Sequence, residues 1–182
     1  MRRDAQHNKQ LIETTAHELF HEYGVAQVSM NQIANALGIG IGTLYRHFSD
    51  KGALCYQLIH TDFYLLIEDM QRIATLEQSK REIFIKSIDL FLNFKLVNKD
   101  LLSCVENTTK KWNFKASDIY QTLYHYYLPL VSCNIDERLS VFKVDMLLNT
   151  LSTQNYEFQI DYRELTNKQL RDQLVALFFD HK

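Results

Sequence analysis

Two histidines one helical turn apart are the first residues that could do chemistry. The segment His17-Glu18-Leu19-Phe20-His21 matches HExxH, in which two histidines hold zinc and the glutamate acts as general base. Such a site needs a third ligand and an edge strand, whereas the preceding sequence predicts only helix. Both histidines also point away from the apolar stripe of their own helix, so a solvated helix face is the stronger interpretation. We therefore expect no catalytic residue, no metal site and no cofactor.

Three scattered cysteines, Cys55, Cys104 and Cys133, form neither a disulfide framework nor the CxxC spacing of a zinc site. Cys104 with His125 could supply a nucleophile and its base, but no orienting third residue is implied. Buried structural thiols are the stronger interpretation for all three cysteines. The sequence thus predicts a protein that is not an enzyme.

A tyrosine-rich segment offers ligand binding instead of catalysis. Tyr120, Tyr124, Tyr127 and Val131 recur at helical spacing. Together with Trp112, the three tyrosines could line a cavity between helices for a small hydrophobic or aromatic molecule. Ordinary core packing explains the same spacing and stays open as the alternative.

A third kind of chemistry, recognition of a nucleic acid, is offered by two short helices joined by a tight turn. Ser29 and Gln32 have the spacing of a capping box and start the first of these helices, which stops at Gly38. Gly38 accepts the positive φ that such a turn requires. A second helix follows from about residue 41 to residue 48. This arrangement predicts a helix-turn-helix, whose second helix has the dimensions of the DNA major groove.

The second helix of this pair has one apolar and one polar face. Leu44 and Phe48 lie one turn apart and are expected to point inward. The outward positions are therefore polar, and they are occupied by Thr43, Arg46 and His47, with Tyr45 at the margin.

The stretch around this pair resembles the DNA-binding domain of the tetracycline-repressor (TetR) family. The family pattern has a phenylalanine before a glycine, a capped helix with Ile-Ala, a Gly-Val turn, then Thr-Leu-Tyr-x-His-Phe and a lysine. The match covers about 50 residues in order and spacing. The matching residues are Phe20, Gly24, Ser29, Ile33-Ala34, Gly38-Ile39, Thr43-Leu44-Tyr45-Arg46-His47-Phe48, Lys51 and Leu54.

The resemblance implies which residues hold the DNA backbone. It implies that Tyr45, His47 and Lys51 bind phosphates and set the register on the duplex. Ser29 would cap its helix and bring that helix to a further phosphate.

The resemblance also implies which residues face the bases. Thr43 and the backbone around Gly42 would lie at base edges, and the fork of Arg46 would reach a guanine or a phosphate. Arg2 and Arg3 could form an arm for the adjacent backbone or minor groove.

Some features depart from the family pattern. Gly40, Ile41 and Val28 stand where the family commonly has a small polar residue, a lysine and a threonine. Residues 1–60 carry five Lys and Arg against five Asp and Glu, so their net charge is zero, whereas DNA-binding domains are usually basic. An all-helical protein-interaction module that has lost sequence-specific DNA binding is therefore the alternative function.

The whole chain is expected to be all-α and to contain two domains. All five glycines lie in the segment from Gly24 to Gly52. The 130 residues after Gly52 contain none, which favours helices over strands joined by tight turns. About nine helices are expected, with capping residues at Ser79, Asp100, Ser117 or Asp118, Asn134 and Thr166. We expect a three-helix DNA-binding domain at residues 1–50 and a larger helical regulatory and dimerisation domain at residues 51–182.

The partners follow from the resemblance and from composition. The last two predicted helices have apolar faces. The first face is formed by Leu139, Phe142, Met146 and Leu147, and the second by Leu170, Leu174, Leu177 and Phe178. In TetR proteins such helices pair with those of a second subunit, which implies a homodimer on a near-palindromic operator. We expect a cytoplasmic regulator, a repressor by the resemblance, that is released by a small-molecule inducer and has no membrane partner, since no apolar stretch is long enough to span a bilayer.

Overall fold

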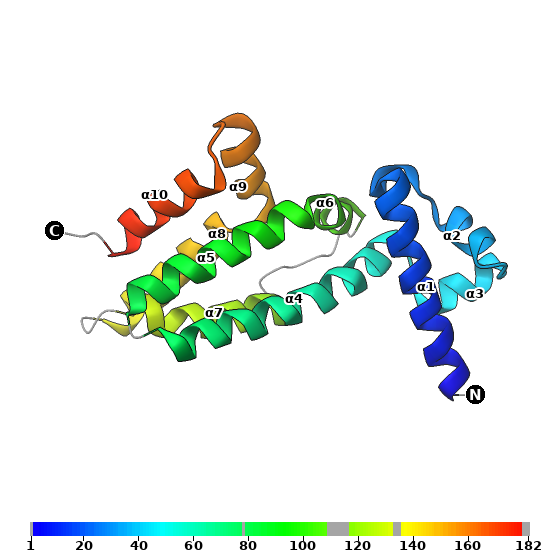
Figure 1. Cartoon of the computed structure of the whole chain (residues 1–182), viewed down its shortest axis with the longest axis horizontal. Helices are drawn as coiled ribbons and strands as arrows, with labels where there is room; N and C mark the ends of the chain where they lie inside the picture. Colours follow the sequence, from blue (N-terminus) through cyan, green and yellow to red (C-terminus); the bar gives the residue numbers. More distant parts are fainter. Residues whose placement is uncertain (1, 78, 109–116, 133–135, 180–182) are drawn as a thin grey trace. The chain divides into compact units, whose positions relative to one another are not determined.

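The computed structural model of the chain describes residues 2–77, 79–108, 117–132 and 136–179. Every regular element in these ranges is a helix, so the predicted all-α class is confirmed (Figure 1). The elements are α1 (Arg2–Tyr23), the 3-10 helix η1 (Val25–Gln27), α2 (Met30–Ala36), α3 (Ile41–His47), α4 (Lys51–Leu76), α5 (Lys80–Val97), α6 (Lys99–Thr108), α7 (Asp118–Val131), α8 (Glu137–Thr150), α9 (Thr153–Glu157), the π-helix η3 (Phe158–Tyr162) and α10 (Asn167–Phe179).

The helices form two compact units. The first unit comprises Met1–Asp62 and Asn98–Trp112, and the second comprises Phe63–Val97 and Asn113–Lys182. The first unit therefore contains α1 to α3, the first part of α4, and α6. It includes more of the chain than residues 1–50, which remain our proposal for the DNA-binding part.

The first unit is built on apolar side chains that α1, α2 and α3 share. Ile12, Ile33 and Leu44, one from each helix, are 0 to 1 % exposed. Tyr23 at the end of α1 does not belong to this core, because it is 56 % exposed. Tyr23 is the last residue of α1, and the chain turns away directly after it at Gly24, whose φ is 83°.

In the second unit, α5 packs against α7 and α10, and α7 packs against α8 (Figure 1). Phe84 of α5 is fully buried at the centre of this unit. Its ring centroid lies 5.9 Å from that of Tyr127 on α7 and 5.9 Å from that of Phe178 on α10. Aromatic side chains from three helices thus form a common core, which accounts for part of the tyrosine and phenylalanine content of this region.

Several of the predicted helix starts are confirmed, whereas Asp100 lies inside the first turn of α6 instead of capping it. Ser117 Oγ accepts from Tyr120 N at 3.1 Å, and Thr166 Oγ1 accepts from Gln169 N at 3.2 Å. The cap expected at Asn134 lies outside the described residues, and α8 is capped instead by Asp136, whose Oδ1 accepts from Arg138 N at 2.8 Å. The short α9 and η3 were not predicted, because their five-residue lengths give no readable apolar period.

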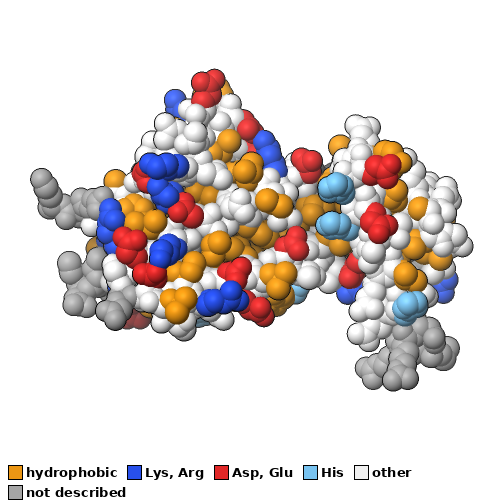
Figure 2. Space-filling view, viewed as in Figure 1, with side chains coloured by type: hydrophobic (Ala, Val, Ile, Leu, Met, Phe, Trp, Pro, Cys, Tyr) orange, Lys and Arg blue, Asp and Glu red, His pale blue; other side chains and the backbone are white. Residues whose placement is uncertain are grey.

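Part of the apolar faces expected on the late helices is not covered within the described chain. Leu139, Phe142 and Met146 on α8 are 42, 58 and 40 % exposed, and Leu177 on α10 is 58 % exposed, whereas Leu147 of α8 is fully buried. In Figure 2, hydrophobic side chains are visible at the surface of this unit among charged ones.

Candidate nucleic-acid interface

The turn between α2 and α3 is fixed by side-chain and backbone hydrogen bonds. Ser29 and Gln32 form the predicted capping box: Ser29 Oγ accepts from Gln32 N at 3.3 Å, and Gln32 Oε1 accepts from Ser29 N at 2.8 Å. Gly38 has a φ of 65°, which an L side chain would strain, and Ile39 N donates to Ala34 O at 3.0 Å to close the turn. These contacts set the position of α3 against α2.

Helix α3 has the two faces that its sequence predicts. Leu44 is fully buried and Phe48, which directly follows the helix, is 5 % exposed, so both anchor α3 inward. Tyr45 is 49 % exposed on the other face. Ile41, at the start of the helix, is 37 % exposed and adds an apolar side chain to the accessible surface.

Arg46 forms hydrogen bonds with two other residues of α3. Arg46 is exposed, and its guanidinium donates to Gly42 O at 3.3 Å and to Thr43 Oγ1 at 3.2 Å. Thr43 and His47 are half-buried. Arg46, Thr43 and Gly42 therefore form one hydrogen-bonded group on the surface of α3, rather than three independent contacts.

A hollow of about 360 Å³ collects three of the residues that the resemblance assigns to DNA. Ser29, Tyr45 and Lys51 line it, together with Asn31 and the segment Ala26–Val28. The Ser29 hydroxyl already donates to Gln32 Oε1 at 2.8 Å, so the Tyr45 phenol and the Lys51 ammonium are the side-chain donors that these three residues leave for a ligand at this hollow. Hydrogen-bond donors gathered in this way suit a phosphate oxygen.

Lys51 is held at this hollow by two contacts within the first unit. Its ammonium donates a hydrogen bond to Val25 O of η1. The same ammonium lies 5.7 Å from the centroid of the Phe20 ring. Lys51 is therefore half-buried and fixed in place, so its charge is positioned before any ligand arrives.

Asn31 and the segment Ala26–Val28 were not assigned to the site from the sequence. They lie beside the capping box, and the backbone of η1 forms one wall of the hollow. The three-residue η1 has no periodic signal. The only sequence signal for η1 was the spacing between Gly24 and Ser29, which leaves room for a single helical turn.

The HExxH segment lies on α1 with His17 and His21 both exposed. Figure 2 shows histidine side chains at the surface of the N-terminal unit near acidic ones. Among the described residues, no group of three or more His, Cys, Asp or Glu is close enough together to hold a metal ion. The side chains of Arg2 and Arg3, considered above as an arm, lie outside the described ones.

The candidate ligand residues lie partly in the core of the second unit. Tyr120 is 7 % exposed and its hydroxyl donates to Asp145 Oδ1 at 2.6 Å; burial and this carboxylate raise the pKa of Tyr120. The Tyr124 ring stacks on that of Tyr120 at 6.3 Å between centroids. Trp112 lies outside the described residues.

Tyr127 is fully buried, and burial raises the pKa of its phenol. Its hydroxyl makes no hydrogen bond of good geometry within the described chain. The Ser87 hydroxyl beside it donates instead to Phe84 O at 3.0 Å. A buried phenol in this state is costly in free energy unless a water or ligand supplies a partner.

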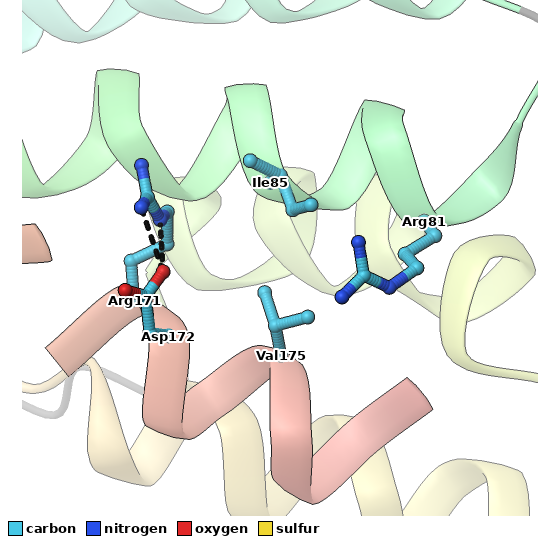
Figure 3. Close-up of a pocket in the computed structure, with 5 residues that line it drawn as sticks. All are labelled: Arg81, Ile85, Arg171, Asp172 and Val175. Atoms are coloured by element: carbon cyan, nitrogen blue, oxygen red, sulfur yellow. Dashed lines mark hydrogen bonds and ion pairs between the residues drawn. The ribbon is translucent and has the colours of Figure 1, made fainter. Parts of the chain in front are cut away.

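A separate hollow of about 290 Å³ lies between α5 and α10 in the second unit (Figure 3). Arg81 and Ile85 line it from α5, and Arg171, Asp172 and Val175 line it from α10. Arg171 is engaged there, because it donates to Asp172 Oδ1 at 2.6 Å and to Asp89 Oδ2 at 2.9 Å. The contact between Arg171 and Asp89 joins α10 to α5 at this hollow. None of the tyrosines considered above lines it.

The comparisons decide the family. A sequence profile of bacterial regulatory proteins of the tetR family matches residues 12–57, the segment from α1 to the start of α4. An HTH-type transcriptional regulator of Staphylococcus aureus strain USA300 is 43 % identical over 180 residues, which cover 99 % of this chain and 97 % of the relative. The chain belongs to the tetR family. It is therefore a DNA-binding transcriptional regulator.

Solved structures of TetR proteins show the same fold at low identity. A TetR/AcrR-family regulator from Thermobifida fusca has a TM-score of 0.67 and 17 % identity, with 96 % of this chain and 98 % of that chain covered. The regulator FadR from Bacillus subtilis, in complex with stearoyl-CoA, has a TM-score of 0.66 and 16 % identity, with 95 % and 99 % covered. The predicted helix-turn-helix domain followed by a helical domain is thus the TetR architecture.

No helix in the described part of the chain combines the length and hydropathy that crossing a membrane requires. The relatives with 43 % identity are transcriptional regulators, a class of proteins that are not enzymes.

Proposed function

We propose that this TetR protein is a ligand-responsive repressor, which binds a near-palindromic operator as a homodimer and is released by a small-molecule inducer. The domain at residues 1–50, together with Lys51 directly after it, binds the DNA, and the domain at residues 51–182 dimerises and holds the inducer. The observation that carries the proposal is the accessible face of α3 beside the hollow that Ser29, Tyr45 and Lys51 share.

The DNA contacts divide by chemistry. Helix α3 enters the major groove, where Thr43 and the backbone at Gly42 meet base edges and Arg46 reaches a guanine or a phosphate. Tyr45 and Lys51 bind one phosphate at their common hollow, and His47 binds the backbone beside it. The fixed position of the Lys51 ammonium supports this assignment, because little side-chain entropy is lost when the phosphate binds.

Homodimerisation is supported by the uncovered apolar residues of α8 and α10. Leu139, Phe142 and Met146 are spaced by three and four residues, so they share one face of α8. Each is at least 40 % exposed in the single chain. Contact with the same face of a second chain, together with Leu177 of α10, would remove these side chains from water.

An inducer site in the second unit is supported by two observations. The buried Tyr127 hydroxyl has no hydrogen bond of good geometry in the described chain. FadR of Bacillus subtilis, which has the same fold, is seen with stearoyl-CoA. We assign the site to the region of Tyr120, Tyr124 and Tyr127 on α7. The inducer favours a conformation whose two recognition helices are wrongly spaced for the operator.

Selection from a randomised duplex pool tests the proposal. The wild-type chain should enrich a near-palindrome whose half-sites are one helical turn or a multiple of it apart. Sedimentation of the complex on that duplex should give two chains per duplex. If a folded dimer enriches no sequence at low salt, the proposal is contradicted and the protein-interaction module is favoured. Gly40 and Ile41, which depart from the family pattern, would then explain the loss of DNA binding.

A further inference from the structure

The first unit contains two cysteines on different helices whose thiols meet. Cys55 lies in the second turn of α4, and Cys104 lies in α6. The two cysteines are 49 residues apart in the chain but belong to the same compact unit. The two thiols are within hydrogen-bonding contact of each other. No sequence pattern pairs them, because only the packing of α6 into the first unit brings Cys104 to α4.

The two thiols differ in access. Cys55 is fully buried, and Cys104 is half-buried. The hydrogen bond with Cys104 and burial together raise the pKa of the Cys55 thiol, whereas nearby Lys51 opposes this rise only in part. Cys104 is therefore the thiol that a reagent meets first, and Cys55 stays protonated behind it until it is needed.

We propose that Cys55 and Cys104 form a modification site for two-electron thiol oxidants, which convert the pair reversibly into an intramolecular disulfide and thereby weaken operator binding. The second half of this statement rests on the proposed function, since it needs an operator. The first half is independent of DNA.

The reaction balances with an azo oxidant of the diamide type. The Cys104 thiolate adds to one nitrogen of the N=N bond, and the other nitrogen takes up a proton. The Cys55 sulfur then attacks the Cys104 sulfur, the S–N bond breaks, and the leaving nitrogen takes the Cys55 proton. The two thiols lose two electrons and two protons in total, and the azo group becomes a hydrazine.

The disulfide would act on the DNA-binding surface through α4. Lys51 and Cys55 are four residues apart, so they lie one above the other on α4. The Lys51 ammonium donates to Val25 O of η1, and α6 packs against η1. Bringing the two sulfurs to about 2.05 Å must shift α6 against α4 and η1. The walls of the hollow that holds Ser29, Tyr45 and Lys51 would move with them.

Peptide mapping tests the covalent step. The full-length chain carrying Cys133→Ser is treated with diamide, and peptides are mapped without reductant. A single Cys55–Cys104 linked peptide that disappears with dithiothreitol is the expected product. Recovery of both thiols unlinked, or a mixture dominated by disulfides between chains, would overturn the proposal.

Duplex affinity tests the consequence, with the duplex enriched by the wild-type chain as the probe. Oxidation of the Cys133→Ser protein should raise its Kd at least tenfold, and dithiothreitol should restore it. Cys55→Ser and Cys104→Ser, each in the same background, should lose this response while they keep the affinity of the reduced protein. A disulfide form that binds as tightly as the reduced form would overturn the regulatory half. Reduced protein that binds no duplex would count against the proposed function alone, because the peptide map still decides the disulfide.

Discussion

The Lys51 ammonium donates a hydrogen bond to the Val25 carbonyl, and this contact joins the start of α4 to η1 at the edge of the candidate phosphate hollow. The same residue is thus part of the fold of the first unit and part of its proposed DNA-binding surface. Its removal should affect both stability and DNA binding, which separates it from a residue that only touches DNA.

Lys51→Met keeps most of the apolar stem over the Phe20 ring but removes the ammonium. We expect the free energy of unfolding to fall by about 1 kcal/mol, because the Val25 carbonyl loses its donor. The slope of log K against log salt should fall by about one unit, because one phosphate contact is lost. Urea unfolding and a salt titration of duplex binding measure the two effects. Lys168→Met on α10, exposed in the second unit, is the control and should leave the salt slope unchanged.

Ser29→Ala removes the side chain that caps α2. The loss of the capping box should cost about 1 kcal/mol of stability. Thr166→Ala removes the equivalent cap from α10 and should cost a similar amount. Only Ser29→Ala should also weaken duplex binding, since only Ser29 lines the hollow. Equal duplex affinity for the two variants, at temperatures where both are folded, would remove Ser29 from the DNA site.

Acidification should destabilise the second unit through Asp172. Hydrogen bonds from Arg171 and Lys168 hold the pKa of Asp172 below its ordinary value of 3.8. The ionised carboxylate is therefore favoured in the folded chain. Its contribution to stability is fully present above pH 4 to 5 and is lost as the pH falls through the lowered pKa.

Asp172→Asn has no carboxylate to protonate at this position. The variant should be less stable than wild type at pH 6, and the difference should shrink toward pH 2.5. Thermal unfolding midpoints across this range measure it. A difference that is the same at pH 6 and pH 2.5 would contradict the role assigned to Asp172.

Phe142→Glu places a charge at the centre of the exposed apolar face of α8. We expect sedimentation equilibrium to change from two chains to one, because a carboxylate buried between two apolar faces is strongly unfavourable. Affinity for the full operator should fall at least tenfold. Leu96→Glu on α5, where Leu96 is 55 % exposed, is the matched control and should leave the dimer intact. If Phe142→Glu remains a dimer as Leu96→Glu does, the dimer interface lies elsewhere on the chain.

The features of the fold that depend on local chemistry could be predicted from the sequence. The Ser29–Gln32 capping box, the positive φ of Gly38 and the inward Leu44 are all set by residues within one or two turns of each other. These positions also define the helix-turn-helix and carry the family pattern. Local spacing was therefore sufficient for the architecture of the helix-turn-helix.

The contacts that depend on packing between distant segments could not be predicted. No local pattern joins Lys51 to Val25 across 26 residues, or Cys55 to Cys104 across 49. The exposure of Phe142 is a similar case, because an apolar period predicts that a face is buried but does not say whether its own chain or another one covers it.

The affinity of Tyr45→Phe for the enriched duplex tests the central claim most directly. Tyr45 is half-exposed and lines the hollow, so removal of its hydroxyl should leave stability unchanged within about 0.5 kcal/mol. Loss of a hydrogen bond to a charged phosphate costs about 1.5–3 kcal/mol, which corresponds to a Kd raised by roughly 10- to 150-fold. Tyr23→Phe, an exposed tyrosine on α1 outside the hollow, is the control and should bind as wild type does. Wild-type affinity for Tyr45→Phe would contradict the assignment of this surface to the DNA backbone.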